Sequence, residues 1–181
     1  MNDIFIEQLV KKKRTVKDNI IFIFTILTVI LVPVVLASLA VTEVLTAYFI
    51  YISFFVLLIG IWSIWMVYSN QKVEFEYQMV QDTLVVSKII DKRKRKHILK
   101  IDVKQFDKLG KANDEEIANA KYMKVFDACA DASDKINTYY AVYQNAGLGK
   151  CALRFTPDEK IMNSMKPYLK KDIVLKLFYN R

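Results

Sequence analysis

The side chains best suited to binding a ligand form a basic run just past the middle of the chain. Ammonium and guanidinium groups attract the phosphates of anionic lipids, and each contributes about 1 kcal/mol near a membrane surface. The same pattern is typical of a solvated hairpin tip that keeps a sheet edge soluble, and of a short nucleic-acid contact. The run consists of Lys92, Arg93, Lys94, Arg95 and Lys96.

A second basic run lies near the N-terminus, directly before a long apolar block, and consists of Lys11, Lys12, Lys13 and Arg14. The chain has 27 Lys and Arg residues against 19 Asp and Glu, a formal net charge of +8. A positive surface beside a membrane favours anionic lipid headgroups over nucleic acid. Both runs are candidates for contact with the membrane surface, with a solvated hairpin tip as the alternative for residues 92–96, and we expect no nucleic-acid partner.

Other reactive side chains are scattered along the chain. His97 is the only histidine and is expected at a strand edge. Cys129 and Cys151 lack CxxC spacing; they could be neighbours in a sheet, and would pair only in an oxidising compartment. Residues 114–116 resemble loop charge. The sequence contains no phosphate-binding glycine loop, zinc motif or nucleophile elbow, so we predict no catalytic residue, metal or cofactor, and no enzymatic activity.

The apolar block that must position the basic runs extends over residues 20–68 and contains one ionisable residue, Glu43. A helix needs about 20 apolar residues to cross a bilayer, and each half of the block is about that long. Backbone groups inside hydrocarbon must bond to one another, which favours helices. The pattern predicts a transmembrane hairpin with helices over about 20–40 and 46–68 and a turn at 41–46.

The flanks of this hairpin predict its orientation. Basic residues precede the first span and Lys72 follows the second, whereas the connection between the spans contains no Lys or Arg. Because cytoplasmic flanks are enriched in Lys and Arg, we expect a multi-pass plasma-membrane protein with both termini in the cytoplasm. Residues 1–19 would form a basic cytoplasmic segment. Within it, residues 1–13 are interpreted as a short interfacial helix or as a poorly ordered terminus.

From Lys72 onward the apolar period becomes two, which is typical of half-buried strands. Polar turns separate the alternating stretches, so we predict an antiparallel meander. Thr156, Pro157 and Glu159 then have the types expected at the N-cap, first position and capping partner of a helix. The predicted strands are 73–79, 83–90, 97–103, 106–110, 122–129, 138–143 and 150–155, and residues 173–178 alternate again.

Short strands followed by one capped helix are the order of a pleckstrin-homology (PH)-like domain. The segments MNDIFIEQLVKKK, VEFEY, DKRKRK and FTPDEKIMNSMKPYL resemble an uncharacterised family of bacterial membrane proteins, in which a transmembrane hairpin carries a PH-like domain. The resemblance implies a membrane α-helical hairpin plus an α+β soluble domain over 72–181. That domain would be a PH-like antiparallel β-barrel or sandwich of about seven strands with a C-terminal helix.

The resemblance carries over no activity, because none is established for the family. The basic run lies between the second and third predicted strands, whereas the phosphoinositide pocket of eukaryotic PH domains centres on the first hairpin. We predict a non-enzymatic membrane protein whose PH-like domain meets membrane lipids or a protein partner at the cytoplasmic face. The alternative is a small subunit of a larger membrane assembly, or a homo-oligomer, with the hairpin as the packing element.

Overall fold

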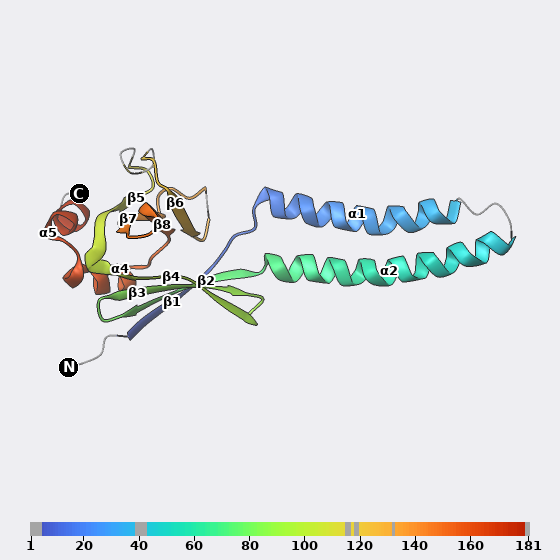
Figure 1. Cartoon of the computed structure of the whole chain (residues 1–181), viewed down its shortest axis with the longest axis horizontal. Coiled ribbons are helices and arrows are strands. Elements are labelled where there is room, and N and C mark those ends of the chain that lie inside the picture. The colour runs from blue at the N-terminus through green and yellow to red at the C-terminus, as the bar shows by residue number, and fades with distance from the viewer. Residues whose placement is uncertain (1–4, 39–42, 115–116, 118–119, 132, 180–181) are drawn as a thin grey trace. The chain divides into compact units, whose positions relative to one another are not determined.

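The computed structural model describes residues 5–38, 43–114, 117, 120–131 and 133–179. Its contacts divide the chain into two compact units. A helical unit comprises Arg14–Lys72, and a sheet-rich unit comprises Met1–Lys13 together with Val73–Arg181. The helical unit is therefore inserted between two parts of the other unit (Figure 1).

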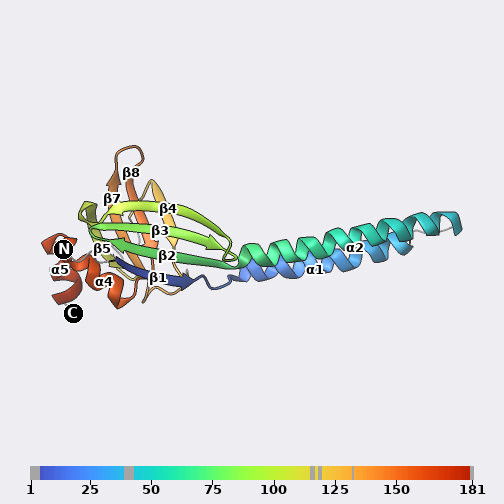
Figure 2. The same ribbon diagram turned by 90° about the horizontal axis from the view of Figure 1, so that it is seen from below.

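The helical unit contains two long apolar helices, α1 (Val16–Ser38) and α2 (Glu43–Gln71). Both are long and apolar enough to span a membrane. They lie side by side in both ribbon views (Figures 1 and 2). α2 begins within the segment predicted as a turn, of which residues 41 and 42 lie outside the described part of the chain.

Local chemistry explains where α1 begins and how its polar groups are satisfied. The Asp18 carboxylate accepts hydrogen bonds from the Thr15 amide at 2.9 Å and the Thr15 hydroxyl at 2.6 Å, which caps the first turn. Within the helices, the hydroxyls of Thr25, Thr28 and Ser63 donate to the carbonyl four residues earlier. Such internal bonds are what a helix surrounded by hydrocarbon requires.

The first sheet contains four antiparallel strands in chain order, visible side by side in Figure 2. They are β1 (Phe5–Lys11), β2 (Val73–Val80), β3 (Thr83–Ile90) and β4 (Lys94–Asp102). Along β2, alternate apolar side chains enter the core as predicted: Val73, Phe75, Tyr77 and Met79 are all buried. β4 begins at Lys94, three residues earlier than predicted, because an edge strand accommodates charged side chains.

The second sheet has the order β5-β7-β8-β6. β7 pairs antiparallel to its two neighbours, but β6 pairs parallel to β8, so the predicted simple meander is wrong beyond β4. A 3₁₀ turn, η1, redirects the chain between the sheets. Two four-stranded sheets form, rather than a closed barrel. The segments are η1 (Val103–Gln105), β5 (Phe106–Lys111), β6 (Lys124–Ala128), β7 (Tyr139–Asn145) and β8 (Gly149–Phe155).

β1 corrects the prediction of a helix near the N-terminus. It pairs with β2 over its whole length, from Phe5 opposite Val80 to Lys11 opposite Glu74. Ile6 and Val10 pack against the core on one face of the strand. The apolar residues of this segment fit a period of two as well as a helical period, and pairing with a distant strand decides between them.

The C-terminal segment packs against the sheets through α4 (Glu159–Met165), which contacts β1 and β2. Its N-cap is Asp158, whose carboxylate accepts from the Ile161 amide at 2.8 Å. Thr156, the predicted cap, instead accepts through its hydroxyl from the Ala130 amide at 3.2 Å. Asp158 therefore satisfies the first turn of the helix while Thr156 joins two loops.

Beyond α4 the chain stays helical instead of forming the predicted alternating segment. A 3₁₀ turn, η2, contains Pro167 and follows directly on the end of α4. Ile173 and Leu177 are four residues apart and both pack against the core, a spacing that one helical face provides. The segments are η2 (Lys166–Tyr168), α5 (Lys171–Val174) and the π-helical η3 (Leu175–Tyr179).

Candidate functional site

Strand register brings the two predicted basic runs to the same end of the first sheet. One cross-strand row there contains Lys11, Glu74, Ile89 and Arg95. β1 ends at this row and β2 begins one residue before it, so the chain leaves for α1 and returns from α2 at this end of the sheet. We call this surface the basic end; its residues are Lys11, Lys12, Lys13, Lys92, Arg93, Lys94, Arg95 and Lys96.

The turn between β3 and β4 shapes the tip of the basic end. Asp91 and Lys92 both take positive φ, at 50° and 56°, and the Arg93 amide donates to the Ile90 carbonyl at 3.1 Å. Two central residues with positive φ match the twist of a hairpin. Lys92 and Arg93 therefore lie in the turn, whereas Lys94, Arg95 and Lys96 extend along β4.

The charges of the basic end are only partly neutralised. Arg95 pairs with Glu76 at 2.7 Å, Arg93 with Asp91 at 3.7 Å and Lys13 with Asp131 at 3.3 Å. Among the described residues, five exposed lysines of this surface have no carboxylate at salt-bridge distance. These are Lys11, Lys12, Lys92, Lys94 and Lys96.

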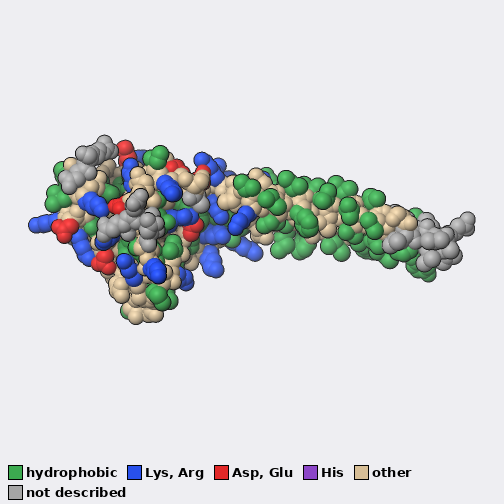
Figure 3. Space-filling view, turned by 90° about the horizontal axis from the view of Figure 1, so that it is seen from above, with side chains coloured by type: hydrophobic (Ala, Val, Ile, Leu, Met, Phe, Trp, Pro, Cys, Tyr) green, Lys and Arg blue, Asp and Glu red, His purple; other side chains and the backbone are tan. Residues whose placement is uncertain are grey.

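Arg14, the last residue of the N-terminal run, belongs to the helical unit. Its guanidinium lies over the ring of Tyr68, 4.7 Å from the centroid, and the Lys72 ammonium lies 4.4 Å from the same centroid. The predicted run is thus divided between the two units. On the face drawn in Figure 3, hydrophobic side chains predominate along the helical unit, whereas acidic and basic side chains are spread over the sheet-rich unit.

A pocket of about 430 Å³ lies on the outer face of the first sheet, beside the basic end. The central group is Glu76, whose side chain is 1% exposed although it faces away from the core. Burial raises the pKa of Glu76, the neighbouring Glu7 carboxyl raises it further, and Arg95 and His97 lower it. The lining residues are Glu7, Leu9, Lys11, Glu74, Glu76, Ile89, Lys92 and Arg95.

Among the described residues, only one of the two carboxylate oxygens of Glu76 has a hydrogen-bond partner. Arg95 donates to Oε1, but Oε2 is buried and accepts no hydrogen bond from the described residues. His97, exposed on the edge strand β4 as predicted, has Nδ1 3.0 Å from the Ser87 hydroxyl. The sequence did not predict that Glu76 is buried, because its alternation with apolar neighbours indicated an exposed side chain.

The two cysteines are buried free thiols. They are not neighbours: Cys151 pairs with Lys124 at the start of β6, whereas Cys129 follows Ala128 at its end. Burial and the Asp127 carboxylate raise the pKa of Cys129 to about 11. A thiol that stays protonated at neutral pH is a weak nucleophile.

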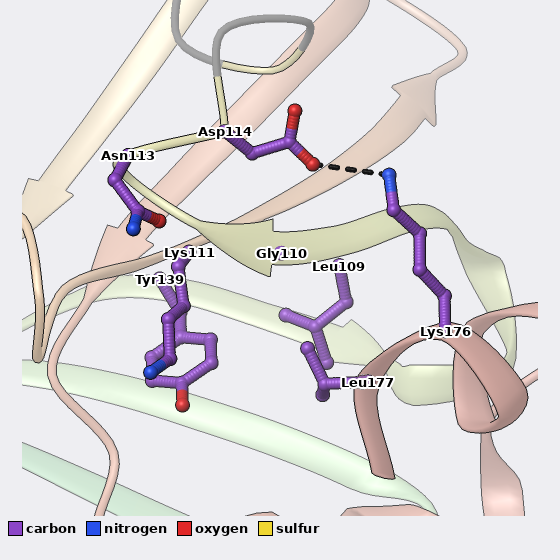
Figure 4. A pocket seen from close by; sticks show the side chains of 8 residues that line it. All are labelled: Leu109, Gly110, Lys111, Asn113, Asp114, Tyr139, Lys176 and Leu177. Carbon is purple, nitrogen blue, oxygen red and sulfur yellow. Dashed lines mark hydrogen bonds and ion pairs between the residues drawn. The ribbon is translucent and has the colours of Figure 1, made fainter. Parts of the chain in front are cut away.

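A second concave region lies between β5, β7 and the C-terminal segment. One pocket of about 310 Å³ is drawn in Figure 4, where Asp114 from the loop after β5 pairs with Lys176 of η3 at 3.0 Å. A neighbouring pocket of about 740 Å³ shares Lys111, Tyr139 and Leu177 with it. Asp114, predicted as loop charge, therefore joins this loop to η3.

Residues 2–175 match the family described as "Bacterial PH-like domain (DUF6106)". The chain belongs to this family. The match runs from the N-terminal segment through the two apolar helices to α5, so the inserted helical unit is part of the family pattern. The membership predicted from the sequence is confirmed. Comparison with curated proteins and with solved structures gives no match.

Proposed function

We propose that the protein is a non-enzymatic membrane protein that holds its PH-like unit at the cytoplasmic face of the plasma membrane. In this proposal α1 and α2 span the bilayer and the basic end contacts anionic lipid headgroups. The observation that carries the proposal is the strand register, which joins Lys11 to the β3–β4 turn at the sheet end leading to both helices.

Chain connectivity supports contact between this end and the headgroups. Lys13 is three residues from the start of α1, and Val73 is two residues from the end of α2. An extended residue covers at most about 3.6 Å, so each connection reaches only about 7 to 11 Å. If the helices span the bilayer, the basic end is held close to its surface, where each lysine contributes about 1 kcal/mol of attraction.

The surface of the helical unit supports insertion into the bilayer. Large apolar side chains are exposed along both helices, among them Ile23, Phe24, Ile30, Phe54, Phe55 and Ile59. A soluble protein rarely exposes an apolar surface of this extent. The aromatic residues at the ends of α2, Tyr48 and Tyr51 near one and Trp62 and Trp65 toward the other, suit the two interfaces.

Lysine protection tests the lipid contact on the full-length protein. The protein is reconstituted into phosphatidylcholine vesicles with or without phosphatidylglycerol, treated with an amine-acetylating reagent and digested for mass spectrometry. We expect phosphatidylglycerol to slow acetylation of Lys94 and Lys96 several-fold, and high salt to reverse the effect. Lys171, exposed on α5, is the internal control. Equal rates with and without phosphatidylglycerol would contradict lipid contact.

Orientation needs a separate test, because buried Cys129 and Cys151 would resist labelling on either side of a membrane. A Lys171→Cys variant offers an exposed thiol on the sheet-rich unit. We expect this thiol to resist an impermeant maleimide in intact cells and to react after the cells are permeabilised. Reaction in intact cells would place the sheet-rich unit outside and overturn the proposed orientation.

The alternative, a subunit whose hairpin packs against other helices, receives less support from the helix contact. A Cβ at Gly60 would lie 2.6 Å from Val29 Cγ1, so this small residue already serves packing between α1 and α2. Crosslinking in native membranes distinguishes the two functions. Crosslinks from the exposed faces of α1 or α2 to another polypeptide would favour the assembly subunit.

A further inference from the structure

We propose that the pocket on the outer face of the first sheet binds a phosphoethanolamine headgroup, with its ammonium at Glu76 and its phosphate at Lys11 and Lys92. The inference rests on the proposed function, because the basic end must lie at the membrane for a lipid to supply this group. It names a zwitterionic ligand, whereas the basic end alone would select only for negative charge.

Glu76 provides the cation site. A buried carboxylate is costly unless it is paired and hydrogen-bonded, yet Glu76 Oε2 accepts no hydrogen bond from the described residues. Arg95 is already bonded to Oε1 at 2.7 Å and leaves the second oxygen open. A primary ammonium supplies three N–H donors and a positive charge in a compact group. It would satisfy Oε2 and also separate Glu76 from the adjacent Glu7 carboxylate.

The lysines provide the anion site on the same pocket. Lys11 lies in the row next to the chain connections, and Lys92 lies in the β3–β4 turn at the same end. Both are exposed and have no carboxylate at salt-bridge distance in the described part of the chain. Their ammonium groups are therefore available for a phosphate.

The spacing of the two sites suits a phosphate and an amine joined by a short spacer. Lys11 and Glu74 occupy one cross-strand row, and Glu76 occupies the next row on the same face, two residues along β2. Two residues of strand span about 7 Å. The lysines are on the side of the pocket nearer the chain connections, where the phosphate of a bilayer lipid would lie. Leu9, 57% exposed, adds an apolar edge to the pocket.

The N–H donors of the primary ammonium should make the pocket selective between two common headgroups. Phosphatidylcholine carries the same phosphate, but its quaternary ammonium has no N–H to donate to Glu76. Binding of the quaternary ammonium would leave the buried charged acceptor Oε2 without a hydrogen-bond donor, which is costly. We therefore expect the pocket to prefer phosphatidylethanolamine over phosphatidylcholine on the order of tenfold or more.

The test measures which lipids the full-length protein retains. Protein is extracted from vesicles containing phosphatidylglycerol, phosphatidylethanolamine and phosphatidylcholine, and bound lipids are counted by native mass spectrometry. We expect about tenfold enrichment of phosphatidylethanolamine over phosphatidylcholine, lost in Glu76→Gln, which keeps an oxygen for Arg95. Asp172→Asn, an exposed carboxylate on α5, should keep the enrichment. Thermal unfolding by circular dichroism confirms that each variant is folded.

The outcomes separate this site from the proposed function. Equal retention of the two zwitterionic lipids, or enrichment that survives Glu76→Gln, overturns the site while leaving lysine protection by phosphatidylglycerol intact. Lower retention of both zwitterionic lipids in the Lys11→Ala, Lys92→Ala double variant supports the phosphate half, and unchanged retention contradicts it. Calorimetry with soluble phosphoethanolamine distinguishes the source: tight binding of the free compound without retention of the lipid would contradict a lipid ligand. Displacement of bound lipid by a lysine-rich peptide, with no selectivity between lipids, would indicate a protein partner instead.

Discussion

The helical unit exposes the same apolar residue types that the sheet-rich unit buries. In α1 and α2, apolar side chains such as Leu27 and Phe54 are more than half exposed. In the sheets, Leu84 and Phe106 are fully buried. The helices bond their backbone within each element, whereas the strands depend on partners far along the chain. The helices are therefore specified locally, whereas the sheets are specified only by tertiary pairing.

The same substitution made in both units should affect their stabilities very differently. Leu84→Ala should lower the free energy of unfolding of the sheet-rich unit by about 2 to 5 kcal/mol, because it leaves a cavity in a closed core. Leu27→Ala, on an exposed helix face, should leave it unchanged. Denaturation of the full-length protein in detergent, followed by near-ultraviolet circular dichroism, measures both. Equal losses would contradict the distinction.

A smaller effect is expected where one side chain ties the two sheets together. The Tyr77 hydroxyl donates to the Ala128 carbonyl and accepts from the Thr156 amide at 3.1 Å. Tyr77→Phe leaves both backbone groups unpaired and should cost about 1 to 3 kcal/mol. The same change at exposed Tyr48 of α2 should cost nothing measurable in this unit. A midpoint in urea that does not move for Tyr77→Phe would argue against the link.

A similar cost is expected at the helix contact. Gly60→Leu places a side chain where Val29 already lies, and overpacking of this kind costs about 1 to 3 kcal/mol. Trp62 and Trp65 are the only tryptophans, so tryptophan fluorescence reports on α2 alone. We expect Gly60→Leu to shift this signal and to lower its thermal midpoint. Gly147→Ala, whose Cβ would have room in a turn of the sheet-rich unit, should leave fluorescence unchanged.

The smallest effects concern pH, and two carboxylates should respond with opposite signs. Burial raises the pKa of Glu76 above 4.5, so the folded state holds this proton after the unfolded chain has lost it. The free energy of unfolding should therefore fall as pH rises above 4.5, and Glu76→Gln should flatten that slope.

Asp131 provides the contrast in the same unit. Hydrogen bonds from Ser133, with Lys13 nearby, lower the pKa of Asp131 to about 2. Its contribution is complete above the ordinary value of 3.8 and is lost as pH falls toward 2. Asp131→Asn should remove only this acid limb of a stability curve measured by urea unfolding. Identical pH profiles for the Glu76 and Asp131 variants would refute the assignment.

The sequence correctly predicted the elements whose residue pattern fits only one type of secondary structure. The two apolar helices and the alternation from Val73 to Met79 are of this kind, and both were found. β1 was missed because its partner lies across the helical insertion, some sixty residues along the chain. The parallel pairing of β6 with β8 was missed because neither strand carries a local signal for its neighbour.

The candidate site divides in the same way. The basic residues were evident from composition, and their meeting at one end of the first sheet follows once β1 is a strand. Glu76 was not evident, since a glutamate between Phe75 and Tyr77 is typical of an exposed strand face. In the folded chain Arg95 from β4 pairs with it and Glu7 from β1 lies beside it. The burial of this charged side chain depends on residues of other strands, which the local sequence around Glu76 does not predict.

Energy transfer from the basic end to the bilayer measures whether this surface lies at the lipid headgroups. A donor dye on a Lys94→Cys variant is compared with one on Lys171→Cys, in vesicles that carry an acceptor on the headgroups. Both sites are exposed, and the native cysteines are buried. The proposal predicts stronger transfer from position 94, increased further by phosphatidylglycerol and reduced by salt. Equal transfer from both positions, unchanged by phosphatidylglycerol, would contradict it.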